Sequence, residues 1–286
     1  MNKEIISYVV LGALALFFLW MILAQITGHK YKRKVFGTRR IPGTSSQIPL
    51  GGNLFGFYYV LREGLRFSLN QRKLNQRLIG AFFLKWMLEG RAVPRAGGGI
   101  LRSGSLGLNL DMSFKDRTEM ALYEMALAAS GRDYILTTGE FNRWVHSNFR
   151  IVENWTDRAK VRGRRFLISR GLLGEDNRGV PAGYDRLQDA IRFRAFLQHS
   201  SLSPRNMEAD PEKWVDYLVL GALCGYAGKV AEQLRRAFPR EFSQFSAAQA
   251  QISGSLDQTI SLSNTLSRSF VRAAEREDAR TERRSR

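Results

Sequence analysis

An uninterrupted apolar stretch near the amino terminus constrains this chain more than any other feature. Residues 5–27 read IISYVVLGALALFFLWMILAQIT and carry no charge. About 20 apolar residues in a helix are enough to cross the hydrocarbon core of a bilayer, which is roughly 30 Å thick. The segment HKYKRKVFGTRR follows at once and contains no acid. We therefore expect residues 1–27 to form a transmembrane anchor.

The charges beside this stretch predict its orientation. Six basic residues follow it: Lys30, Lys32, Arg33, Lys34, Arg39 and Arg40. By the positive-inside rule they place residues 28–286 in the cytoplasm and the amino terminus outside, with the anionic lipid of the inner leaflet as a partner. The alternative is a cleaved signal peptide, whose apolar region is shorter, about 7–15 residues. The length of the run and the basic residues after it favour an uncleaved, single-pass anchor.

The remaining chain has the composition of a folded protein with a strong positive charge. Of 286 residues 44% are hydrophobic, which supports a buried core, and the net charge is +18. Such a charge suits an anionic membrane surface or nucleic acid, although a solvated basic surface is the simplest explanation. The single cysteine, Cys224, excludes an intramolecular disulfide, and its apolar neighbours predict a small buried residue rather than a nucleophile.

No motif in the sequence predicts catalysis, a cofactor or a metal site. The glycine-rich segment AGGGILRSG lacks the Gly-Lys-Ser/Thr of a phosphate-binding loop, so a hairpin tip is the better interpretation. Neither a Gly-x-Ser-x-Gly motif nor a His-Glu-x-x-His motif occurs. Asp116 and Glu119 have helical spacing, but they stand at a predicted helix start, where acids act as caps. We therefore expect a protein that is not an enzyme.

The pattern along the chain predicts a mainly α fold with small β-hairpins, of the α+β class. A helix over 69–89, followed by strands at 92–94 and 106–110, resembles a winged-helix unit. A second such unit is predicted from a helix after Asp116, an extended step at 135–136, two further helices and a strand at 166–173. The predicted divisions are an anchor at 1–27, a basic segment and linker at 28–56, winged-helix-like units at 57–112 and 113–173, a helical segment at 184–242, and a flexible tail at 243–286.

Two segments near the carboxyl terminus leave alternatives open. The apolar run 214–228 is short for a second membrane span and contains Asp216, so we expect a buried core helix after the start signal at Pro211. Within the tail, the apolar residues of 252–270 recur at helical intervals. This segment therefore has the pattern of a helix that folds on a partner or on a membrane.

Residues 190–234 resemble part of a known family. The matching residues are Phe193, Phe196, Leu197, Glu208, Trp214, Tyr217, Leu218, Ala222, Gly225, Ala227, Lys229 and Ala231. They resemble the cytosolic carboxyl-terminal region of the YciQ-like group, bacterial predicted membrane proteins of unknown function. This resemblance implies a bacterial inner-membrane location and supplies no catalytic residues. The chain departs from the pattern because it has neither a large domain before the anchor nor a second pair of spans.

One basic segment is the candidate surface for a partner. It contains Arg150, Arg158, Lys160, Arg162, Arg164 and Arg165, and its alternative is a solvated helix face. Two functions follow. The first is a non-enzymatic, single-pass inner-membrane protein that presents a basic cytosolic scaffold to a protein partner. The second is a membrane-tethered regulator that binds nucleic acid through its winged-helix-like surface.

Overall fold

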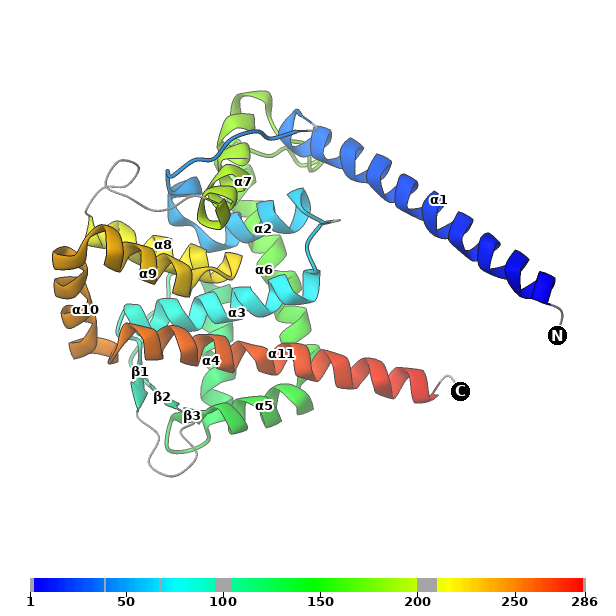
Figure 1. Ribbon diagram of the computed structural model, residues 1–286. Coiled ribbons are helices and arrows are strands. Elements are labelled where there is room, and N and C mark those ends of the chain that lie inside the picture. The colour runs from blue at the N-terminus through cyan, green and yellow to red at the C-terminus, as the bar shows by residue number, and fades with distance from the viewer. Residues whose placement is uncertain (1–2, 39, 67, 96–103, 200–209, 285–286) are drawn as a thin grey trace.

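Helices form most of the protein, and a small antiparallel sheet lies at one end of the body (Figure 1). The computed structural model describes residues 3–38, 40–66, 68–95, 104–199 and 210–284. The helices are α1 (Lys3–Phe36), α2 (Leu54–Gly64), α3 (Gln71–Leu88), α4 (Arg117–Ser130), α5 (Thr138–Ser147), α6 (Phe149–Ser169), α7 (Tyr184–His199), α8 (Pro211–Cys224), α9 (Ala227–Ala237), α10 (Pro239–Ser253) and α11 (Leu256–Arg284). The strands are β1 (Ala92–Arg95), β2 (Ser105–Leu108) and β3 (Ile135–Thr137), and two 3₁₀ turns are η1 (Pro49–Gly52) and η2 (Pro181–Gly183). The predicted α+β class is confirmed.

The predicted membrane anchor falls on α1, which extends away from the body (Figure 1). Among the residues that the structure describes, no helix combines the length and the apolar character needed to cross a bilayer. A large part of the predicted anchor, including the side chains of 1–10 and 22–26, lies outside the described residues.

The carboxyl-terminal end of α1 is fixed to the body. Val35 and Phe36 are almost completely buried. The Phe36 carbonyl accepts a hydrogen bond from Gln188 Nε2 at 2.9 Å, and the Lys34 carbonyl accepts one from the backbone of Gly179 at 3.1 Å. A Cβ at Gly179 would lie 2.0 Å from the Val35 carbonyl oxygen, so this contact requires glycine.

Within the segment predicted as a basic stretch and linker, 28–56, the part from residue 41 onward is held against α7 and α8. The Ser45 backbone donates to the Arg192 carbonyl at 3.3 Å, and Arg192 Nε donates to the Pro42 carbonyl at 3.3 Å. The Tyr217 hydroxyl donates to the Ser46 carbonyl. The segment then turns through η1 into α2, so residues 54–56 belong to a helix and not to a linker.

Buried polar and aromatic contacts join α2, α3 and α6. Tyr58 donates a hydrogen bond to Asn75 Oδ1 at 2.7 Å, and Asn75 Nδ2 donates to Thr156 Oγ1 at 3.2 Å. Beside them the Phe82 ring packs edge-on against Trp155, with centroids 5.8 Å apart. Each buried group thus has a partner on another helix, which fixes the relative positions of the three helices.

The two predicted winged-helix-like units share one sheet. The predicted hairpin is confirmed, because Ala92 pairs with Leu108 and Pro94 with Leu106. However, β3 comes from the second unit and pairs with β2 of the first, so the boundary predicted at residue 112 cuts through the sheet. A three-residue strand cannot form a stable sheet alone, which explains why it joins the hairpin.

The strand predicted at 166–173 is wrong. Helix α6 continues to Ser169, and beyond it Leu173 makes only an isolated bridge with Gly179. The glycine-rich tip predicted at 97–99 lies outside the described residues.

The predicted core helix at 214–228 is confirmed in part. Trp214, Leu218 and Leu220 are fully buried in α8. The predicted helix ends earlier, however, because Gly225 takes the left-handed conformation with φ of 83° and separates α8 from α9.

Residues 243–274 of the tail that was predicted to be flexible are instead mostly helical and supply buried side chains to the core, whereas the helical residues after 274 are mostly exposed. Helix α11 lies along α3 and α5 (Figure 1) and buries Leu266 and Phe270. A Cβ at Gly80 of α3 would lie only 3.1 Å from Ser267 Oγ, so small residues let the two helices approach closely. The helical spacing within 252–270 therefore matches a partner inside the same chain.

This packing gives a direct test. Leu266→Ala should lower the free energy of unfolding by about 2–4 kcal/mol, because it removes a fully buried side chain from the α11 interface. The neighbouring Thr265 is exposed, so Thr265→Ala should change it by less than about 0.5 kcal/mol. Urea unfolding of the full chain, followed by tryptophan fluorescence, measures both. Equal stability of the two variants would mean that α11 does not contribute to the core.

Candidate functional site

The six basic residues predicted as a partner surface all lie on α6, but they do not share one face. Arg150, Arg158 and Arg165 are exposed. The other three, Lys160, Arg162 and Arg164, are half-buried and form ion pairs with Glu63, Asp116 and Glu175 respectively. Half of the predicted surface therefore serves the packing of α6 against the body. Binding of a polyanion by the exposed half stays a prediction.

The basic residues next to the predicted anchor are mostly open to solvent. Lys30, Arg33, Lys34 and Arg40 are exposed, and Lys32 is half-buried. Arg39 lies outside the described residues. This group remains available to an anionic surface.

A cavity of about 720 Å³ lies where the linker meets the helical body. Its walls come from η1, α2, α3, the start of α4, α6, α7 and α8, segments that are far apart in the sequence. Its volume falls in the range of small-molecule sites, about 300–1,000 Å³. Ten charged side chains line it: Lys85, Glu89, Lys115, Asp116, Glu119, Arg162, Arg170, Arg186, Asp189 and Asp216.

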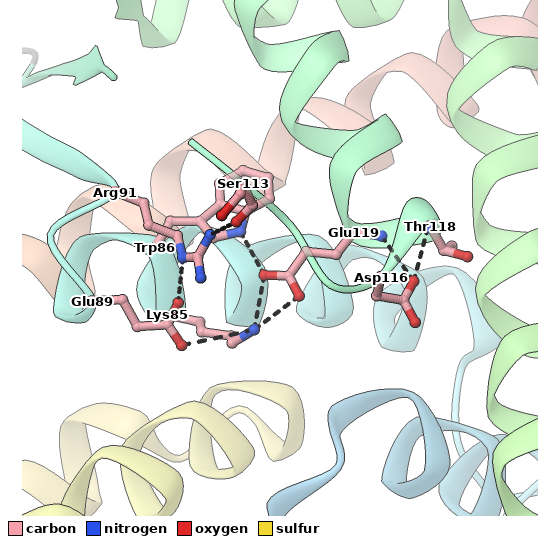
Figure 2. Close-up of polar contacts among 8 residues, drawn as sticks. All are labelled: Lys85, Trp86, Glu89, Arg91, Ser113, Asp116, Thr118 and Glu119. Atoms are coloured by element: carbon pink, nitrogen blue, oxygen red, sulfur yellow. Dashed lines mark hydrogen bonds and ion pairs between the residues drawn. The ribbon is translucent and has the colours of Figure 1, made fainter. Parts of the chain in front are cut away.

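Glu119 organises the polar wall of this cavity (Figure 2). Its carboxylate accepts hydrogen bonds from Lys85 Nζ at 2.8 Å and from the buried Trp86 Nε1 at 3.0 Å. Lys85 also lies 3.7 Å from Glu89, which in turn pairs with Arg91 at 2.6 Å. Because Glu119 is only 7% exposed, these partners are needed to stabilise its charge.

Asp116 begins α4 and joins it to α6. Its carboxylate accepts a hydrogen bond from the Thr118 backbone at 2.8 Å, as an N-cap does, and forms an ion pair with Arg162. Burial alone would raise the pKa of Asp116, but the hydrogen bonds from Arg162 and Thr118 outweigh it and hold the pKa below its usual value. The predicted capping role of Asp116 is confirmed. Glu119, by contrast, is a buried ion-pair residue.

Asp216, on α8, also lines the cavity. No hydrogen bond or ion pair joins it to another residue in the described part of the chain. Burial raises the pKa of Asp216, while the attraction of Lys85 acts in the opposite direction. The η1 turn comes so close that a Cβ at Gly52 would lie 2.8 Å from Asp216 Oδ2. Glycine at residue 52 therefore leaves the carboxylate its space.

Three cations at the rim are also without acidic partners. Lys115, Arg170 and Arg186 are exposed, and none forms an ion pair with a described residue. Arg170 lies over the Phe166 ring, with its guanidinium carbon 5.6 Å from the centroid. In contrast, Asp189 pairs with Arg192 at 3.0 Å. The charged side chains at the rim that have no ion-pair partner among the described residues are therefore positive.

The cysteine and the metal predictions concern other parts of the molecule. Cys224 is buried, as expected, and burial raises the pKa of its thiol to about 12. Within the ranges that the structure describes, no group of three or more His, Cys, Asp and Glu residues is placed to hold a metal ion.

The sequence did not reveal the cavity, because seven separate elements build it. A local signal existed only at η1, where Pro-Leu-Gly-Gly indicates a turn. In the sequence, Asp216 is distinguished only as a charged residue within an apolar run, and in the structure it lines the cavity.

None of the known families, curated proteins or solved structures compared with the chain matches it. The resemblance of residues 190–234 to the YciQ-like group stays a prediction.

Because three of the six basic residues on α6 form ion pairs and three are exposed, substitutions at the two kinds of position should have different effects on stability. Lys160→Ala removes a partner of Glu63, which is 4% exposed, and should destabilise the fold by about 1–2 kcal/mol. Arg165→Ala should change stability by less than about 0.5 kcal/mol, because Arg165 is exposed. Urea unfolding separates these outcomes, and an equal loss in both variants would contradict the inward role of Lys160.

The Asp116 ion pair predicts a pH dependence of stability. Because the pKa of Asp116 is lower in the folded state than its unfolded value of about 3.9, its contribution is present above that pH and is lost as the pH falls through the folded pKa. Asp116→Asn keeps an N-cap acceptor and removes the charge. The urea midpoint of the wild type should exceed that of the variant by a constant amount above about pH 5, and the difference should shrink below about pH 4. A difference that does not depend on pH would contradict this assignment.

Proposed function

We propose that the protein is a non-enzymatic, single-pass membrane protein that holds a basic helical module against the inner leaflet, where the module binds a protein partner. Lipid around α1 is the part of this proposal with the strongest support. The partner is supported only by the size and charge of the exposed body.

The observation that carries the proposal is the exposure of α1. Nine consecutive residues, Leu11–Leu19, are apolar and exposed, and the large ones among them are 49–69% exposed. Nine residues make two and a half helical turns, so this apolar surface faces every direction. A helix that is apolar on all sides is covered by a protein core or by lipid. Because α1 extends away from its own body, we assign the cover to lipid (Figure 1).

The basic residues beside α1 support a position at an anionic leaflet. Lys30, Arg33, Lys34 and Arg40 are exposed directly after the apolar run. Each basic residue near such a surface contributes about 1 kcal/mol of attraction. Since Val35 and Phe36 are buried in the body, the body would sit close to the bilayer rather than on a long tether.

Nucleic acid is the less favoured partner. Three of the six basic residues on α6 point into ion pairs, and the exposed face between the others carries Glu153 and Asp157. This mixture of charges weakens the attraction to a phosphate backbone.

Membrane attachment is tested by vesicle flotation of the full chain and of a variant that begins at residue 28. The full chain should float with vesicles of phosphatidylcholine and phosphatidylglycerol and should resist extraction with alkaline carbonate. The shortened chain keeps the buried Val35 and Phe36, so its body should remain folded. It should float only at low salt, because only the basic residues attach it.

Substitutions within α1 provide the matched control. Replacing Leu14, Leu16 and Phe18 together by Arg should abolish carbonate-resistant flotation, since each Arg at the centre of a span costs about 2.5–3.5 kcal/mol. Replacing the same residues by Ile should leave it unchanged. Extraction of the wild-type chain from the vesicles by carbonate would contradict the proposal.

Thiol labelling distinguishes a spanning helix from one that lies on the surface. Cys224 is buried, so new thiols from Lys3→Cys and Lys32→Cys can be labelled selectively in intact vesicles. A spanning α1 gives labelling of the two positions from opposite sides. Labelling of both from one side would contradict the single-pass arrangement.

A further inference from the structure

We infer that the cavity beside η1 binds a small organic anion, with a phosphate or carboxylate group at the basic rim and an apolar body inside. No residue of α1 lines the cavity, so this inference does not rest on the membrane attachment proposed above. A soluble organic phosphate and a phospholipid both combine such an anionic group with an apolar part, so either could be the ligand class.

The charge balance of the cavity favours an anion. Its acids are mostly neutralised, because Asp116, Glu119 and Asp189 each have a cation within the same or a neighbouring helix. The unpaired charges are three cations, Lys115, Arg170 and Arg186, against Asp216 alone. Arginine is well suited to this task, since its planar donors bind phosphate or carboxylate through two parallel hydrogen bonds.

Apolar side chains also line the cavity and can contact a hydrophobic part of a ligand. Leu50, Phe166 and Val215 line the cavity and are half-buried, so each keeps surface that a ligand can cover. Leu54 and Phe55 complete this side. Sites of this volume commonly combine such apolar walls with a few polar groups that orient the ligand.

Asp216 supplies a second polar group that lines the cavity. The half-buried carboxyl has no hydrogen-bonding partner among the described residues. A carboxylate in this position can accept a hydrogen bond from a hydroxyl or amino group of a ligand. We therefore expect a ligand that combines an anionic group with a hydrogen-bond donor.

The backbone at η1 is strained where it forms the cavity wall. Leu50 has φ of 56°, in the left-handed region, and Gly51 and Gly52 follow at 61° and 73°. A non-glycine residue in this region costs about 1–2 kcal/mol. Such strain persists where the surroundings enforce it, and it concentrates at ligand sites. Here the strained turn brings Gly52 against Asp216, and both residues line the cavity.

The test uses calorimetric titration of the full chain in non-ionic detergent with phenyl phosphate. Phenyl phosphate combines the anion with an apolar ring, and we expect saturable binding with a Kd below about 1 mM. Inorganic phosphate and phenol, which each carry one half of these features, should bind at least tenfold more weakly. Dihexanoyl phosphatidic acid distinguishes the source: tighter binding than phenyl phosphate assigns the site to a lipid headgroup, and weaker binding assigns it to a soluble anion.

Matched variants locate the site. The double variant Arg170→Ala and Arg186→Ala should weaken binding of phenyl phosphate at least tenfold. The double variant Arg240→Ala and Arg268→Ala removes the same charge from exposed residues outside the cavity and should leave the Kd unchanged. Val215→Trp should block the cavity, whereas Val161→Trp changes an exposed residue of α6 outside it and should have no effect. Urea midpoints confirm that each variant is folded.

Two results would overturn the inference. One is the absence of saturable binding of all four probes to the wild-type chain. The other is an equal loss of affinity in the two arginine double variants, which would mean that the probe responds only to the overall charge.

Discussion

Helix α3 is apolar on every side over two turns, and the rest of the body is arranged to cover it. All seven residues from Leu78 to Leu84 are buried. Burying a large apolar side chain contributes about 1.5–3 kcal/mol, so an uncovered side of α3 would cost a large part of a domain's stability. Helices α8 and α11 pack along it, and α2 and α6 complete its aromatic surroundings. The carboxyl-terminal segment must therefore return to the centre, although its sequence is rich in serine and charge.

Local signals in the sequence were enough to predict the elements that depend on nearby residues. Asp116 caps α4, Thr137 forms a capping box with Glu140, and Pro211 begins α8. The hairpin of β1 and β2 could also be predicted from its local sequence. Pairings between segments that are distant in the sequence could not be predicted in this way. The run 166–173 suits a strand or a helix by composition, and only the packing of Leu167 within α6 decides for the helix. The same limit concealed the pairing of β3 with β2 and the whole of the cavity.

Many of the basic residues that dominate the composition act inside the fold. Lys85 joins α3 to α4, Arg162 joins α6 to α4, and Lys160 joins α6 to α2. Removing one partner from such a pair leaves a poorly solvated charge, so these residues behave as structural ones. A net charge of +18 consequently overstates the polyanion-binding surface. Exposed basic residues lie beside α1, at the rim of the cavity and along part of α6, but others, such as Arg240, Arg268 and Arg272, lie on α10 and α11.

One segment connects the two sites for which we propose ligands. Beyond the buried end of α1, residues 40–53 run along α7, accept a hydrogen bond from Tyr217 and then form the cavity wall at η1. A ligand that contacts η1 therefore acts on the backbone to which α1 is attached. If it favours one position of this segment, membrane attachment must change the affinity for the ligand by the same factor, because coupling between two binding sites is reciprocal.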